Sequence, residues 1–129
     1  MSGVVLDASA MLAVLRGENG AQKVIASLAD AAISTVNLAE VVGALTRDGV
    51  SPPEIQAMLE GFPAEVIVLD RDLAFDAGLL LPLTRAAGLS LGDRVCLALA
   101  RRRSAAALTG DRAWMWVADA VGVEVELIR

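Results

Sequence analysis

Four acidic side chains stand where an apolar segment ends or a helix begins: Asp7, Glu40, Asp93 and Asp111. The sequence has no histidine and only one cysteine, so any metal site must be built from oxygen ligands. Oxygen ligands suit hard cations such as Mg²⁺ and Mn²⁺ better than Zn²⁺. The four acids therefore indicate metal-assisted chemistry on a phosphodiester.

Two of the acids follow uninterrupted apolar runs. Asp7 comes after residues 3–6, and Asp111 comes after residues 105–108. Runs without alternation are typical of strands that are buried on both faces of a parallel sheet. Ligands of open parallel sheets bind beyond the carboxyl ends of the strands, and both acids are expected at that edge.

Similar runs recur along the chain, separated by segments with helical patterning. The predicted buried strands cover residues 3–6, 31–34, 66–69 and 105–108, and the alternating residues 123–127 predict an edge strand. The predicted helices cover residues 9–16, 21–29, 37–48, 52–60, 72–87, 91–102 and 112–121, with a kink or break at Pro82. Glu40 and Asp93 thereby lie near the starts of two helices. The alternation predicts an α/β fold around a parallel sheet.

Length and composition favour one domain over residues 1–129 with a core of aliphatic side chains. Hydrophobic residues make up 56% of the chain, and aromatic residues only 3%. Cys96 cannot form an internal disulfide and is expected as a buried thiol, which fits a reducing cytoplasm. The sequence offers neither a signal peptide nor an uncharged apolar run of about 18 residues, so we expect a cytoplasmic protein without membrane contact.

The net charge of −5 argues weakly against a nucleic-acid partner, because such proteins usually carry a basic patch. Two features weaken that argument. Ten of the eleven basic residues are arginine, whose planar fork matches phosphate. Carboxylates that hold a metal also count as negative here, although the bound ion neutralises them.

Each of the four acids also has an ordinary structural explanation as a helix cap. Asp7 and Asp111 could be N-cap residues, and residues 37–40 and 90–93 both resemble capping boxes. Asp93 fits this explanation least, because Leu97 and Ala100 continue its helical row and an unpaired carboxylate on a buried row is costly. Glu40 lies opposite the apolar stripe of its helix, as a solvated glutamate would.

Other polar and aromatic residues are weaker candidates. Ser9, Asn37 and Thr109 are expected to support the site. Asp70 also follows an apolar run, but it is interpreted as a cap of the next helix. Trp114 and Trp116 are expected in the core or in a dimer contact rather than stacked on bases.

In sequence order, the four acids lie in segments that resemble the motifs of PIN-domain nucleases. The segments are VLDAS at residues 5–9, STVNLAEV at 34–41, LSLGDRVCLALA at 89–100 and LTGDRAW at 108–114. The resemblance covers the whole chain and departs from the family at none of the acidic positions. The length of the chain and its last two motifs are most similar to those of the VapC-type toxins of toxin–antitoxin pairs.

The resemblance implies a three-layer α/β/α sandwich with a five-stranded parallel sheet in the order 3-2-1-4-5. It also implies an endoribonuclease that uses Mg²⁺ or Mn²⁺ at Asp7, Glu40, Asp93 and Asp111. Proteins of this kind usually form homodimers and are silenced by a cognate antitoxin. We therefore expect an RNA substrate, an antitoxin protein and a second copy of the chain as partners.

Two other functions stay open at this stage. An aspartyl-nucleophile phosphatase also places an aspartate after its first strand, but it needs a second one where this chain has Ser9, and its lysine is missing from the expected region. A non-catalytic dimeric scaffold would use the four acids only as caps. Activity with added Mn²⁺ separates the nuclease from the scaffold.

Overall fold

The computed structural model describes residues 3–129 and contains a five-stranded parallel sheet in the order β3-β2-β1-β4-β5. The strands are β1 (Val4–Leu6), β2 (Ala31–Ser34), β3 (Glu65–Ile67), β4 (Ala106–Thr109) and β5 (Val125–Leu127). β1 lies in the centre, where Val5 pairs with Ala32 on one side and Ala107 on the other. The predicted fold class and strand order are confirmed.

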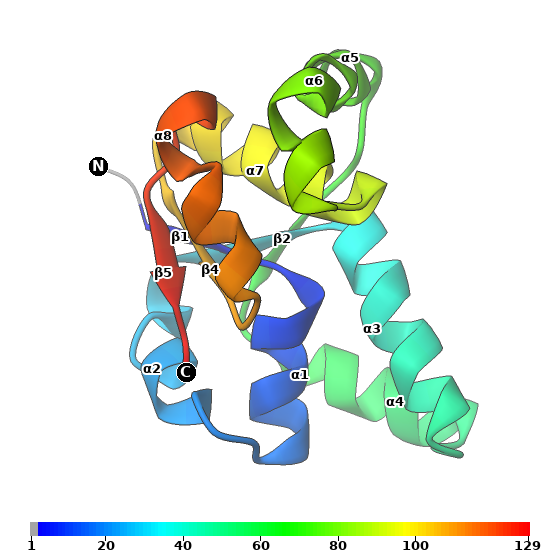
Figure 1. Ribbon diagram of the computed structural model, residues 1–129. Coiled ribbons are helices and arrows are strands. Elements are labelled where there is room, and N and C mark those ends of the chain that lie inside the picture. Colours follow the sequence, from blue (N-terminus) through cyan, green and yellow to red (C-terminus); the bar gives the residue numbers. More distant parts are fainter. Residues whose placement is uncertain (1–2) are drawn as a thin grey trace.

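Helices cover both faces of the sheet (Figure 1). One layer holds α1 (Ala8–Arg16), α2 (Ala21–Ile25), α3 (Thr35–Arg47) and α4 (Pro52–Glu60). The other holds α5 (Arg71–Leu79), α6 (Leu81–Thr84), α7 (Leu91–Arg103) and α8 (Ala118–Val121), with the 3₁₀ helices η2 (Arg85–Ala87) and η3 (Arg112–Trp116). A short 3₁₀ turn, η1 (Leu28–Asp30), leads into β2.

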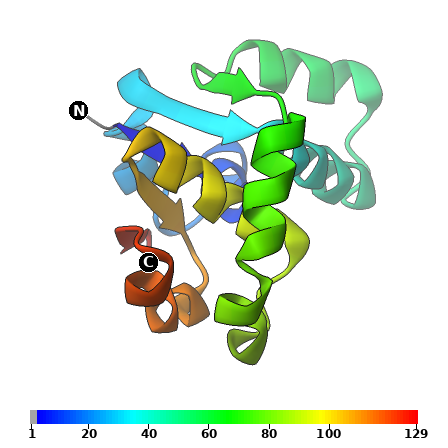
Figure 2. The ribbon, with the colours of Figure 1, turned by 90° about the horizontal axis from the view of Figure 1, so that it is seen from above.

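Two hydrophobic cores follow from the alternation of side chains along the strands. Val5 and Ala107 face the layer with α5 and α7, whereas Leu6 and Leu108 face the layer with α1 and α3. α7 runs against the sheet with residues 95–100 all buried (Figure 2). This packing fixes the first turn of α7, which carries Asp93, against the carboxyl edge of the sheet.

Some boundaries differ from the predictions. The segment 66–69 was expected as a strand buried on both faces, which is wrong, because β3 is an edge strand that pairs only with β2. Val66 and Val68 are therefore 47% and 66% exposed. The segment 112–121 divides into η3 and α8 rather than forming one helix, and 72–87 breaks before Pro82, as predicted.

Helix ends use the expected chemistry. Ser51 and Glu54 form a capping box at the start of α4, and Gly17 and Gly88 take the left-handed conformation after α1 and η2. Cys96 is buried and free, as predicted. Within residues 3–129, no helix is long and apolar enough to cross a membrane.

Candidate metal centre

Asp7 is buried at the carboxyl end of β1, where its side chain is 6% exposed. It is the N-cap of α1 and accepts a hydrogen bond from the Ala10 amide at 2.9 Å. The hydroxyls of Ser9 and Thr109 also donate to it, at 2.7 and 2.6 Å. The two supporting candidates Ser9 and Thr109 therefore do touch Asp7.

Burial raises the pKa of the Asp7 carboxyl above its ordinary value. The three hydrogen bonds act in the opposite direction, and the negative charge of Asp93 adds to the rise. Asp7 is thus held in one orientation by its hydrogen bonds, and the negative charge of Asp93 in α7 destabilises its ionised form.

Asp93 lies half-buried in the first turn of α7. Its carboxylate accepts a hydrogen bond from the Ser90 amide at 2.9 Å, and its own amide donates to the Ser90 hydroxyl at 3.2 Å. The capping box predicted for residues 90–93 is present, and it satisfies part of the carboxylate. Burial nevertheless raises its pKa, and the charge of Asp111 adds to the rise.

Glu40 is exposed but points to the first turn of α7 rather than away from it. Its Oε1 accepts a hydrogen bond of 2.8 Å from the Nδ2 of Asn37, which also donates to the Gly92 carbonyl at 3.2 Å. The Oδ1 of Asn37 accepts a bond of 2.8 Å from the Ser34 hydroxyl. Asn37 is buried and fully bonded, so it ties β2, α3 and α7 together and orients Glu40.

Gly92 is a site residue that the sequence prediction missed. A Cβ atom at Gly92 would overlap the Glu40 carboxylate, since it would lie 2.8 Å from Oε1. Its φ angle is not in the left-handed region, so a side chain at this position would act by displacing the Glu40 carboxylate rather than by straining the backbone. The only signal in the sequence is a glycine in a helix first turn beside an acid.

Asp111 follows β4 and caps η3 by accepting a hydrogen bond of 2.9 Å from the Ala113 amide. Its own amide donates to the Thr109 hydroxyl at 3.0 Å. Thr109 therefore contacts Asp7 through its donated proton and Asp111 through its oxygen. Next to it, the Gly110 amide donates to the Ser9 hydroxyl at 2.8 Å, which joins the two strand ends a second time.

Three of the four acids, which come from different elements, act on one buried residue. Burial raises the pKa of the Cys96 thiol, and the charges of Asp7, Asp93 and Glu40 raise it further. Asp111 joins the group through its effect on Asp93. The carboxyl edge between β1 and β4 is thus strongly negative.

In this conformation, no three acidic or thiol side chains within residues 3–129 are close enough together to hold a metal ion. Each acid instead has at least one oxygen engaged with an amide or hydroxyl nearby. The donor set still suits a hard cation, because every candidate ligand is a carboxylate. A cation would also relieve the burial and mutual repulsion that raise the pKa values of Asp7 and Asp93.

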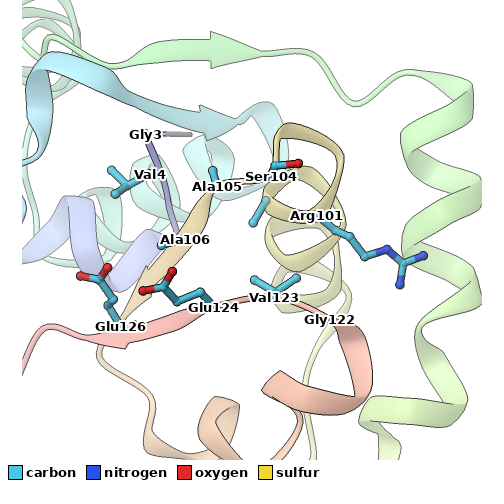
Figure 3. Close-up of a pocket in the computed structure, with 11 residues that line it drawn as sticks. Gly3, Val4, Arg101, Ser104, Ala105, Ala106, Gly122, Val123, Glu124 and Glu126 are labelled. Atoms are coloured by element: carbon cyan, nitrogen blue, oxygen red, sulfur yellow. The ribbon is translucent and has the colours of Figure 1, made fainter. Parts of the chain in front are cut away.

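A separate depression of about 350 Å³ lies at the opposite, amino ends of β1 and β4 (Figure 3). Its wall includes Val4, Ala106 and Glu124, and Arg101 extends away from Glu124 and Glu126. None of the predicted site residues lines it. The four candidate acids and the depression therefore lie at opposite edges of the sheet.

The fold and the position of the acids are those of a known protein family. A family model described as PIN domain matches residues 4–119. The chain therefore belongs to the PIN-domain family. A search of curated proteins returns no match.

Three solved structures share the fold. The chain is similar to a DNA-bound VapBC from Salmonella typhimurium, with a TM-score of 0.78, 19% identity and complete coverage of both chains. For VapBC2 from Rickettsia felis bound to a promoter DNA fragment, the TM-score is 0.73 at 19% identity, covering 96% and 97% of the two chains. For a toxin–antitoxin complex from Klebsiella pneumoniae, the values are 0.64 and 20%, with 84% and 86% covered.

The raised pKa of Asp93 predicts a pH-dependent stability difference. The pKa of a solvated aspartate is about 4, and the folded-state pKa of Asp93 lies above it. The metal-free protein should therefore lose stability as the pH rises from about 4 through the folded-state pKa, because the carboxylate ionises less readily in the folded protein than in the unfolded chain. Asp93→Asn keeps an oxygen for the Ser90 amide, so it should raise the melting temperature at pH 7, with a smaller difference near pH 4. Mg²⁺ or Mn²⁺ should stabilise the wild type more than the variant.

Asp70→Asn is the matched control, because Asp70 is also an N-cap but its pKa is lowered by the Leu73 amide and by Arg102. This control should lower the melting temperature at pH 7. A lower melting temperature for Asp93→Asn, or equal metal shifts in wild type and variant, would mean that Asp93 serves only as a cap.

Proposed function

We propose that the protein is a metal-dependent endoribonuclease. The observation that carries the proposal is that Asp7 and Asp111 meet at the carboxyl ends of β1 and β4, where the Thr109 hydroxyl contacts both residues, while Asp93 lies in the first turn of α7. Such crevices are the ligand sites of open α/β sheets. Membership of the PIN-domain family supports hydrolysis of RNA phosphodiester bonds.

Asp7 and Asp93 would be the main ligands of Mg²⁺ or Mn²⁺, with Glu40 and Asp111 completing the charge or holding water. A bound ion would neutralise charge on the scissile phosphate and lower the pKa of water. Ser9 and Thr109 keep Asp7 in one orientation, and Asn37 does the same for Glu40. Carboxylates that are not bound to the ion can accept a proton, so histidine is not required.

Neither alternative has a comparable supporting observation. A phosphatase of the aspartyl type would need an acid at position 9, where the Ser9 hydroxyl bridges Asp7 and the Gly110 amide. A scaffold whose acids are only caps is compatible with the hydrogen bonds at Asp7, Asp93 and Asp111. It does not explain why these caps also lie within reach of each other's charge.

Asp7→Asn and Asp93→Asn should each abolish RNA cleavage, because each removes a charged ligand. Losses of 100-fold or more are expected by analogy with the removal of one strong electrostatic contact in an enzyme site, which costs about 10²–10³ in rate. Cleavage of a labelled RNA with Mg²⁺ or Mn²⁺ and with excess chelator measures the effect. Circular dichroism checks that each variant is folded.

Asp70→Asn is again the control, since Asp70 follows β3 as the N-cap of α5 but pairs with Arg102. It should retain cleavage. Full activity in chelator, or in both site variants, would remove the nuclease assignment.

The protein is further proposed to be the toxin of a toxin–antitoxin pair, as supported by its similarity in fold to VapBC and toxin–antitoxin complexes. A free ribonuclease would damage its own cell, so a neutralising partner is required. An arginine or lysine of the partner, placed among Asp7, Asp93 and Asp111, would block the metal position. Arginine suits this role because its fork matches paired carboxylates.

Co-expression with the neighbouring gene product tests this part of the proposal. The two proteins should co-elute in size exclusion, and the complex should cleave RNA far more slowly than the free protein. Substituting the inserted cation of the partner by alanine should restore cleavage. Separate elution, or a complex as active as the free chain, would contradict the toxin assignment.

A homodimer is the proposed state of the free protein. Phe75, Leu79 and Leu83 are spaced four residues apart along α5 and α6 and are 66%, 57% and 45% exposed. A stripe of this size on a helix face is typical of a protein contact. Covering it with a second copy would remove the apolar surface from water.

Leu79→Glu should convert the dimer to a monomer in sedimentation velocity, because it places a charge in the centre of the stripe. Val68→Glu is the control, as Val68 is 66% exposed but lies between β3 and α5, outside the stripe. A variant that remains dimeric, or a wild type that is monomeric at all concentrations, would rule out this interface.

A further inference from the structure

η3 presents an exposed indole next to the acidic edge. Trp116 is 77% exposed, and the neighbouring Met115 is 48% exposed, whereas Trp114 is completely buried. Of the two places expected for the tryptophans, the core or a dimer contact, Trp114 takes the core and Trp116 does not. Trp114 anchors the short helix in the core, so the ring of Trp116 is carried by a fixed backbone.

The period of a 3₁₀ helix places Trp116 in the row of Ala113, because side chains three residues apart eclipse one another. The Ala113 amide is the group that donates to the Asp111 carboxylate. Trp116 thus lies one turn beyond the residue that contacts the acid, roughly 10 Å along η3 from Asp111 at a rise of about 2 Å per residue. A nucleotide next to the scissile phosphate could reach it.

Two arginines accompany the indole. Arg112 begins η3, and Arg85 begins η2, which packs beside η3. Both are exposed, and neither forms an ion pair or side-chain hydrogen bond with any other residue in 3–129.

The arginines at the far end of α7 behave differently, since Arg102 and Arg103 pair with Asp70 and Glu65. Paired arginines contribute little net field, whereas Arg85 and Arg112 leave two uncompensated cations in a chain of net charge −5. Unpaired guanidinium groups beside an acidic site can attract a polyanionic ligand and bind its phosphates.

We infer that Trp116, Arg85 and Arg112 form a binding face for single-stranded RNA beside the acidic edge, with a base stacked on the indole and flanking phosphates on the guanidinium groups. The inference rests on the proposed ribonuclease function and names the residues that would position its RNA. Stacking on an exposed aromatic ring requires an unpaired, splayed base.

The test measures binding separately from cleavage. A fluorescent single-stranded RNA oligomer is titrated, with Mg²⁺ present, into protein that carries Asp93→Asn to prevent cleavage. Adding Trp116→Ala should weaken binding about tenfold, and Trp116→Phe should restore most of it, because loss of one stacked base has an effect of this size. A duplex of the same sequence should bind weakly and be indifferent to Trp116→Ala.

Salt dependence tests the two arginines. Arg85→Ala and Arg112→Ala should each reduce the slope of log K against log salt by about 0.7, the value for one phosphate contact on a single strand. Arg47→Ala is the matched control, because Arg47 is exposed, forms no ion pair within residues 3–129 and ends α3, about 18 Å along the helix from its first residue at the sheet edge. It should leave both affinity and slope unchanged.

Unchanged RNA affinity in Trp116→Ala, with unchanged slopes in both arginine variants, would overturn the binding face. If the wild type still cleaves RNA, the ribonuclease proposal survives that result. An altered sedimentation coefficient of Trp116→Ala with unchanged RNA affinity would show that Trp116 contacts protein instead, and it would also overturn the inference. A wild type that neither binds nor cleaves single-stranded RNA would remove both proposals.

Discussion

The hydrogen bond from Thr109 to Asp7 joins residues that are 102 positions apart, and the rest of the site depends on it. It exists because β1 and β4 are neighbours in the sheet and end at the same level, with Leu6 opposite Leu108. A second hydrogen bond joins the same two strand ends, because the Gly110 amide donates to the Ser9 hydroxyl. Together these bonds hold a buried carboxylate at the strand edge, which α3 and α7 then surround with two further acids.

This arrangement has opposing effects on stability and function. Burial and neighbouring negative charge destabilise the charged forms of Asp7 and Asp93, as their raised pKa values indicate. The capping bonds from Ala10 and Ser90 offset part of that cost by satisfying one oxygen of each acid. The same residues thus serve as helix caps and as candidate ligands, so the capping and metal interpretations are not exclusive. Only binding of a cation distinguishes a site from a set of caps.

The sequence predicted the features that depend on local pattern. Uninterrupted apolar runs indicated the parallel strands, and the proline at 82 indicated the break between α5 and α6. The capping partner of Asp93 was foreseen as a motif, but its helical row suggested an unpaired acid. Gly92 was missed because its role arises from Glu40, which is 52 residues away in the chain. The sequence left both tryptophans between the core and a dimer contact, and only the structure separates the buried Trp114 from the exposed Trp116.

The central claim is that these acids hold a divalent cation, and crystals grown with Mn²⁺ test it most directly. Anomalous scattering at the manganese edge locates the ion without relying on activity. The account predicts a peak within direct coordination distance of carboxylate oxygens of both Asp7 and Asp93, with the peak lost in Asp93→Asn crystals. A peak that touches neither residue, or no peak at saturating Mn²⁺, would contradict it.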